Sequence, residues 1–217
     1  MDNKKTLEKT FRYGFPFLSF FAYVIAFAII FGTFGLALNV ALYNILLSLP
    51  LFALFLLISR RYHIAAILTA AAAFLLFYAD GYVFSARLTH IRFSDLMLIS
   101  QAARVAGRYP LIWSWEITRR LVIALALCAF LVFIRRYYKL RYRRKPAFFA
   151  GLGLLALSLA VVFSGVIPTG EREDFNFAED AENRGLLYSW YCQVGSGKLT
   201  APEGYSPEAA EEVLGRY

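Results

Sequence analysis

The sequence predicts an all-α membrane protein that crosses the bilayer several times, and three observations support this prediction. Hydrophobic residues make up 59% of the 217 residues and charged residues only 18%, whereas a soluble domain carries ~25% charged residues. The apolar residues form long blocks, which argues against a soluble nucleic-acid-binding protein despite the net charge of +8. The high hydrophobicity excludes disorder, and two cysteines are too few for a disulfide scaffold.

Four of five expected membrane spans follow directly from the apolar blocks. Residues 13–59 contain no charged side chain, and because one span needs ~20 residues, this block predicts two helices joined by a short turn. We place them at residues 15–34 and 40–58. Two further apolar segments predict a third span at residues 64–84 and a fifth at residues 147–167.

The fourth span has the weakest signal. Its apolar segment, residues 121–134, is too short to cross ~30 Å of hydrocarbon, so we expect the helix to begin near Leu111. This start places Glu116 in the outer part of the span, where it can pair with Arg119 and Arg120 at three- and four-residue spacing.

Basic residues close to the span ends predict the orientation. With residues 1–14 in the cytoplasm, a five-helix membrane domain at residues 15–167 leaves the C-terminus outside the cytoplasm. More than half of the 23 basic residues then face the cytoplasm. They are Lys4, Lys5, Lys9, Arg12, Arg60, Arg61, Arg135, Arg136, Lys139, Arg141, Arg143, Arg144 and Lys145.

The loop at residues 85–110 is expected on the outer side. Ser94 can cap a helix that begins at Asp95, and Gly107 and Pro110 suit its end. The spacing of apolar and basic residues predicts a short amphipathic helix on the outer leaflet. An ordinary connecting helix packed on its neighbours is the alternative.

The segment at residues 168–217 changes character. It holds ten acidic and four basic residues, which predicts a solvated, extended extracytoplasmic linker. Its aromatic centre, residues 186–191, could lie at the membrane interface. Ser206 and the following Pro207 are typical of a helix start, and we expect them to lead into a domain that the chain does not contain.

Two glycine motifs imitate nucleotide-binding sequences without their context. Residues 151–156 match a dinucleotide fingerprint but lie inside an apolar span, so helix packing explains them better. Residues 195–200 resemble the end of a phosphate-binding loop but carry Leu199 where Ser or Thr is required. The histidines and cysteines are not clustered, so no metal ligand and no cofactor is assigned to this chain.

The candidate binding residues are charged groups near the outer side. Asp80 and Glu116 are acids within spans, and an intramembrane acid is a functional candidate by default; for Asp80 we favour an ion pair with Arg87. Guanidinium groups bind phosphate with two parallel hydrogen bonds, so outer arginines could hold anionic lipid head groups. Simple pairing with Asp95, Glu116 and the acidic segment is the alternative. The arginines are Arg87, Arg92, Arg104, Arg108, Arg119 and Arg120.

Several motifs resemble a known family. They are Asn183-Arg-Gly185-Leu-Leu, Pro202-Glu-Gly204-Tyr205-Ser206-Pro207-Glu208, Ile91-Arg-Phe93-Ser-Asp95-Leu and Gly107-Arg-Tyr109-Pro110. Together with the five spans, they resemble the membrane region and linker of phosphoglycerol transferases of the lipoteichoic acid synthase type, in the alkaline phosphatase/sulfatase superfamily.

The resemblance implies a bacterial cytoplasmic-membrane protein that acts on cell-envelope glycerophosphate polymers. In that family an external domain uses a metal-bound hydroxyl nucleophile to take glycerol phosphate from phosphatidylglycerol, and a divalent metal such as manganese is implied there. No position of this sequence matches that nucleophile or those ligands, so no catalytic residue is carried over. The implied role is a membrane anchor that could present lipid, with phosphatidylglycerol as its partner.

Two other functions remain open from the residues alone. A self-standing transporter subunit or assembly factor needs polar or broken helices near the midplane, for which the sequence offers Asn44, Ser48 and Pro50. A small enzyme acting on lipids needs a polar cluster at the interface, with Asp80 and His90 among the candidates. The sequence is also compatible with a homo-oligomer.

Overall fold

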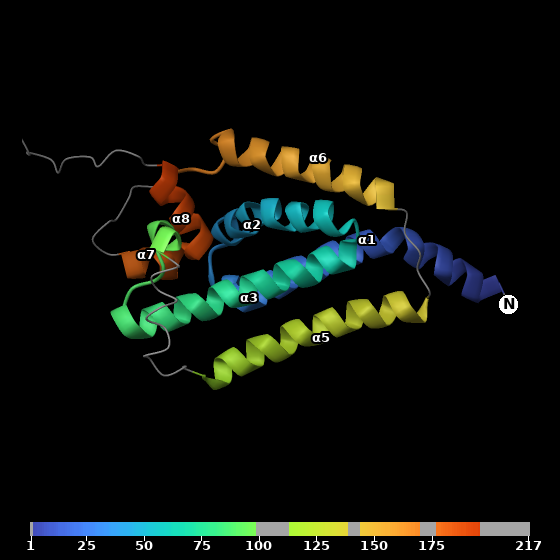
Figure 1. Cartoon of the computed structure of the whole chain (residues 1–217), viewed down its shortest axis with the longest axis horizontal. Coiled ribbons are helices and arrows are strands. Elements are labelled where there is room, and N and C mark those ends of the chain that lie inside the picture. The colour runs from blue at the N-terminus through green and yellow to red at the C-terminus, as the bar shows by residue number, and fades with distance from the viewer. Residues whose placement is uncertain (1, 99–112, 139–143, 170–176, 196–217) are drawn as a thin grey trace, which may run out of the picture.

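The structure, a computed structural model, describes residues 2–98, 113–138, 144–169 and 177–195 (Figure 1). Within these ranges every regular element is a helix and none is a strand. Five helices are long and apolar enough to cross a membrane, which confirms the predicted all-α class and the number of spans. These helices are α1 (Asp2–Phe31), α2 (Leu38–Ser59), α3 (Tyr62–Arg87), α5 (Trp115–Tyr137) and α6 (Arg144–Phe163).

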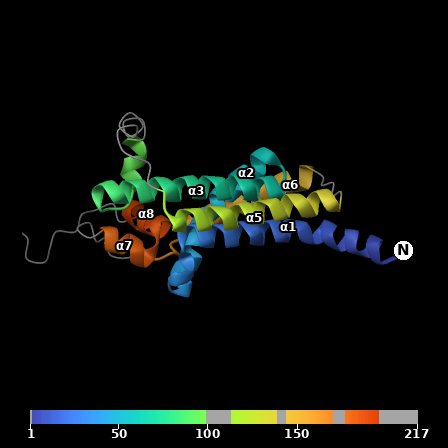
Figure 2. The ribbon, with the colours of Figure 1, turned by 90° about the horizontal axis from the view of Figure 1, so that it is seen from below.

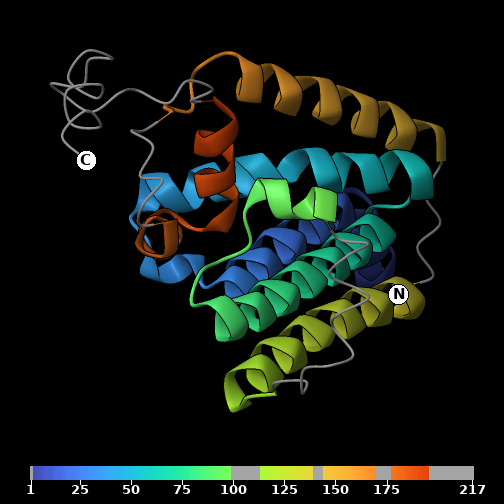
Figure 3. The ribbon, with the colours of Figure 1, turned by 60° about the vertical axis from the view of Figure 1, so that its left-hand side comes forward.

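Consecutive long helices run in opposite directions, so the bundle has two distinct ends (Figure 1). Helix α6 packs on α2, α2 packs on α3, and α1 packs against both α3 and α5, which also contact each other (Figure 3). The N-terminal turns of α1 extend beyond the other helices (Figure 2). We call the end near them the basic end, because it carries Arg60, Arg61, Arg135, Arg136, Arg144 and Lys145.

The opposite end carries two short helices, α7 (Phe177–Arg184) and α8 (Leu186–Gly195), which form a helical hairpin. We call it the hairpin end. Helix α8 packs on α2 and on η2 (Phe93–Leu98), a 3₁₀ segment that follows α3 (Figure 3). A second 3₁₀ turn, η1 (Thr33–Gly35), joins α1 to α2.

Aromatic stacking and small residues hold the centre of the bundle together. The rings of Tyr23 and Phe52 stack with their centroids 4.7 Å apart, and the hydroxyl groups of Tyr23 and Ser48 are hydrogen bonded. On α3, Ala70 and Ala73 are buried. Small side chains at these positions allow α1 and α2 to lie close to α3.

The fourth and fifth spans differ from the predicted boundaries. Residues 113 and 114 are not helical, and the hydroxyl of Ser114 accepts the N–H of Ile117 at 3.2 Å. Helix α5 therefore begins at Trp115 rather than near Leu111, because this cap fixes its start. The helix gains its length at the other end, where it continues through Arg135 to Tyr137. Helix α6 covers residues 144–163 rather than 147–167.

The loop after α3 begins differently from the prediction. Ser94 lies inside η2 and is not the cap of a helix beginning at Asp95. Instead, the carboxylate of Asp95 reaches back three residues and accepts the backbone N–H of Arg92 at 3.1 Å, as the acidic residue of a capping box does. The rest of the predicted amphipathic helix, residues 99–110, lies outside the described residues.

Part of the acidic C-terminal segment is folded rather than solvated. In the hairpin, Phe177, Leu186, Tyr188 and Trp190 are buried, and so is Asp180. The aromatic residues expected at the membrane interface therefore pack on the bundle, whose helix ends supply the core that this short segment lacks. The predicted helix start at Ser206 lies outside the described residues.

Candidate functional site at the hairpin end

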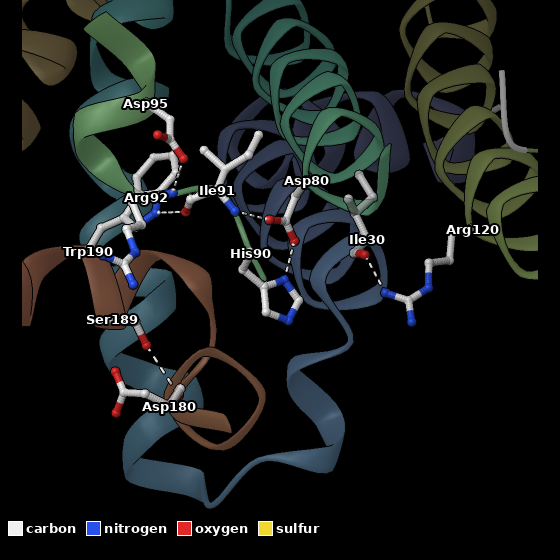
Figure 4. Close-up of polar contacts among 10 residues, drawn as sticks. All are labelled: Ile30, Asp80, His90, Ile91, Arg92, Asp95, Arg120, Asp180, Ser189 and Trp190. Atoms are coloured by element: carbon white, nitrogen blue, oxygen red, sulfur yellow. Dashed lines mark hydrogen bonds and ion pairs between the residues drawn. The ribbon is translucent and has the colours of Figure 1, made fainter. Parts of the chain in front are cut away.

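A buried carboxylate organises the turn after α3. Asp80 lies near the end of α3 and is 8% exposed. Its Oδ2 is 2.7 Å from Nδ1 of His90, and its Oδ1 accepts the backbone N–H of Ile91 at 2.8 Å (Figure 4). Helix α3 ends at Arg87, and the next residue, Leu88, has a left-handed conformation with φ of 56°. This reversal brings His90 and Ile91 back over Asp80.

The expected ion pair between Asp80 and Arg87 is wrong. Arg87 lies 3.7 Å from Asp95 instead, in a largely exposed contact. The chain reversal after α3 places the backbone N–H of Ile91 and the imidazole of His90 next to Asp80. These two groups hydrogen bond to the buried carboxylate, so it does not need a flexible surface arginine as its partner. Glu116 behaves as predicted, with its carboxylate 2.5 Å from Arg120 and 3.7 Å from Arg119.

Both backbone polar groups of Ile91 are hydrogen bonded to side chains. Asp80 accepts its N–H, and the indole Nε1 of Trp190 donates to its carbonyl oxygen at 2.6 Å (Figure 4). The ring of Phe93 meets that of Trp190 edge to face, with centroids 6.1 Å apart. Helix α8 is therefore fixed to the loop after α3 by a buried hydrogen bond and an aromatic contact.

A buried asparagine in α2 fixes the turn between α7 and α8. Asn44 donates from Nδ2 to the carbonyl of Arg184 at 2.7 Å and accepts the N–H of Tyr188 at 3.2 Å. Gly185 lies between these groups with φ of 77°, and a Cβ at this position would lie 2.7 Å from Nδ2 of Asn44. Only glycine allows this approach without strain.

Further polar contacts stabilise the hairpin and join it to the residues that follow α6. Asp180 lies 2.9 Å from Nε of Arg184, and its carbonyl accepts the hydroxyl of Ser189 at 3.2 Å (Figure 4). The hydroxyl of Tyr188 donates to the carbonyl of Pro168 at 2.9 Å. Burial is the largest cause of a raised pKa for the Tyr188 phenol, so this group stays a hydrogen-bond donor at neutral pH.

The structure divides the predicted arginine set. Arg120 is mostly buried: it donates to the carbonyl of Ile30 at 2.5 Å, and its guanidinium lies 4.7 Å from the centroid of the Phe77 ring. Arg92 lies 5.5 Å from the centroid of the Phe177 ring. Arg120 therefore has structural partners within the bundle, and Arg92 has one in the hairpin.

The other described members of the set are more accessible. Arg87 and Arg119 have side chains that are 59% and 61% exposed. Arg104 and Arg108 lie outside the described residues. In the described part of the chain these arginines divide between two acids. Arg87 pairs with Asp95, which also accepts the backbone N–H of Arg92, and Arg119 and Arg120 pair with Glu116.

The site offers an oriented imidazole rather than a metal centre. Nδ1 of His90 faces the Asp80 carboxylate, and among the described residues its Nε2 has no hydrogen-bond partner. No group of three or more His, Cys, Asp or Glu side chains occurs where the structure describes the chain. The fingerprint-like Gly151 packs against Leu57 of α2, as expected for helix packing.

Sequence reasoning named Asp80 and His90 for one candidate function and Asn44 for another, but it did not connect any of them to the hairpin. The available signals were polar residues in apolar helices, which need partners in a bilayer. Asp80 and Asn44 hydrogen bond to backbone groups of residues far along the chain, and the sequence does not show which backbone groups the fold brings close to them.

The chain was compared with family models, curated proteins and solved structures. No family model, curated protein or solved structure matches the chain.

Proposed function

We propose that the chain is the membrane domain of a phosphoglycerol transferase-like enzyme of the lipoteichoic acid synthase type. Its role is to anchor the enzyme and hold the segment after the bundle at a fixed place beside the bilayer. The proposal rests on the sequence resemblance together with one structural observation, the docking of the hairpin.

The docked hairpin is the observation that carries the proposal. The motif Asn183-Arg-Gly185-Leu-Leu, which contributes to the resemblance, contains the turn that Asn44 holds through two hydrogen bonds. Trp190 ties the same hairpin to Ile91. A passive tether needs no such contacts, whereas an anchor that positions a neighbouring segment requires a rigid connection at the membrane surface.

We further propose that the hairpin end faces away from the cytoplasm. The basic end collects the residues that the positive-inside rule assigns to the cytoplasm, and the hairpin end carries Asp180 and the other acids of α7. In this orientation Arg87 and Arg119 lie at the outer leaflet. Their exposed guanidinium groups make them the described candidates for holding a phosphatidylglycerol head group.

The intramembrane polar residues do not favour a transporter. Asn44 is occupied by the hairpin turn. Ser48 bonds to Tyr23 and to the carbonyl of Ile45, and α2 continues as one helix through Pro50.

A chimaera tests the proposal. Residues 1–217 replace the membrane region and linker of a lipoteichoic acid synthase in a bacterium depleted of its own enzyme, and glycerophosphate polymer is measured. We expect synthesis with the native chain and much less with a Gly185→Val chimaera that reaches the membrane at equal level. A five-span protein of unrelated sequence serves as the control. Equal synthesis with that control would show that any tether suffices and would contradict the proposal.

A further inference from the structure

The basic end has an excess of positive charge. All the carboxylates whose side chains the structure describes belong to residues near the hairpin end. At the basic end the first turns of α1 contain Asp2 and Glu8, and the basic residues of that end outnumber these two acids. The acids with described side chains are Asp80, Asp95, Glu116, Glu179, Asp180 and Glu182.

Arg135 is the most constrained of these cations. It lies in the last turn of α5, and its NH1 donates to Nε2 of His63 at 2.9 Å. His63 is 3% exposed, and its ring lies 5.9 Å from that of Phe15. Within the described chain, Arg135 makes no ion pair.

The chemistry of this contact leaves the charge of Arg135 available. An imidazole that accepts a hydrogen bond at Nε2 is neutral. His63 therefore orients the guanidinium and leaves its positive charge in place. A carboxylate at the same position would neutralise that charge. A half-buried cation at the edge of a membrane span is costly unless an anion approaches it, and the remaining N–H groups of the guanidinium are suited to a phosphodiester.

Neighbouring groups add to the same field. Arg61 directly precedes α3. The first turn of α3 contains His63 and no acidic residue, and no side chain caps the start of this helix. Arg60 lies 5.2 Å from the centroid of the Phe148 ring on α6. Arg61 and the N-terminus of α3 thus place positive charge beside His63, the residue that Arg135 contacts.

We propose that Arg135, oriented by His63 and supported by Arg61, binds the phosphodiester of an anionic phospholipid in the leaflet at the basic end. The ligand class follows from the position at a span end, where lipid head groups supply the available anions. The site is separate from the hairpin end and does not depend on any transferase activity.

Lipid selectivity of the purified chain tests this proposal. The full chain is placed in bilayers with the same composition in both leaflets. Electron spin resonance then gives the association constant of spin-labelled phosphatidylglycerol relative to phosphatidylcholine. We expect Arg135→Gln to reduce this ratio about fivefold, which corresponds to the ~1 kcal/mol contributed by a basic residue at the membrane surface. Arg136→Gln on the same turn is the matched control, expected to change the ratio less than twofold.

Two changes at His63 separate lipid binding from a general loss of structure. His63→Gln keeps a neutral acceptor for Arg135 and should preserve the ratio. His63→Asp should lower it to the level of Arg135→Gln, because the carboxylate neutralises the guanidinium. An unchanged ratio in Arg135→Gln, or an equal loss in Arg136→Gln, would overturn the proposal. Loss of the preference on adding inorganic phosphate would identify a free anion as the ligand and would also overturn it.

Discussion

The guanidinium of Arg120 donates a hydrogen bond of 2.5 Å to the carbonyl oxygen of Ile30 in the last turn of α1. Glu116 holds the same side chain from its own helix, and the Phe77 ring covers it. The carbonyls at a helix C-terminus lack intrahelical donors, so Arg120 satisfies one of them and joins α5 to α1. Arg120, a candidate either for lipid binding or for pairing with Glu116, thus makes the predicted pair and also acts as a helix cap.

Replacing Arg120 by Ala should destabilise the bundle by about 2 kcal/mol, because a charged hydrogen bond and a ring contact are lost together. Thermal unfolding in detergent measures the effect. Arg119→Ala removes only an exposed ion pair on the same helix and should cost less than about 0.5 kcal/mol. Equal losses in the two variants would contradict the capping role.

A methyl group at Gly185 should loosen the hairpin. Gly185→Ala forces a Cβ to within 2.7 Å of Asn44 in a left-handed backbone, at a cost of about 1–3 kcal/mol. We expect faster hydrogen exchange and proteolysis in α7 and α8 while α1 to α3 keep their protection. Gly153→Ala is the control, since nothing lies within 4 Å of a Cβ there. Unaltered protection of α8 in Gly185→Ala would refute this prediction.

Removing the Asp80 carboxylate should release the turn after α3. In Asp80→Leu the N–H of Ile91 loses its acceptor, a loss of about 1–3 kcal/mol for a buried group. Hydrogen exchange at the Ile91 amide should rise by at least tenfold. Arg87→Gln removes only the exposed contact with Asp95 and should leave that amide protected. If exchange at the Ile91 amide rose equally in both variants, the result would indicate that Arg87 also holds this turn, contrary to the structure.

The hairpin should weaken at alkaline pH. Burial raises the pKa of Tyr188, so its stabilising contribution is fully present below the unfolded pKa of about 10 and is lost as pH rises through the folded pKa. Tryptophan fluorescence followed across this range should show an alkaline transition. Tyr188→Phe, which keeps the ring, should lack this transition; a persisting transition would assign it to another group.

Fusions test the orientation. Green fluorescent protein attached after Tyr138 should be fluorescent, and alkaline phosphatase attached there should be inactive, because the basic end is expected in the cytoplasm. Alkaline phosphatase attached after Gly195 should be active. The reverse pattern at both sites would invert the proposed topology.

The accuracy of the sequence predictions differed between elements for physical reasons. The five spans were predictable because hydrocarbon thickness and backbone hydrogen bonding leave a long apolar helix few alternatives. The start of α5 was misplaced because length alone could not show that Ser114 caps the helix, or that Arg135 remains inside it. The partner of Asp80 was missed because the reversal at Leu88 brings backbone groups to it that no side-chain pattern encodes.

The sequence by itself determined that the chain spans a membrane, how many times it does so and where its basic residues gather. These properties depend on local hydrophobicity and charge, which are additive along the chain. Tertiary structure alone decided that Asn44 receives the turn at Gly185, that Trp190 holds Ile91 and that His63 orients Arg135. Each of these contacts joins residues far apart in sequence, because buried polar groups must find partners wherever packing brings them.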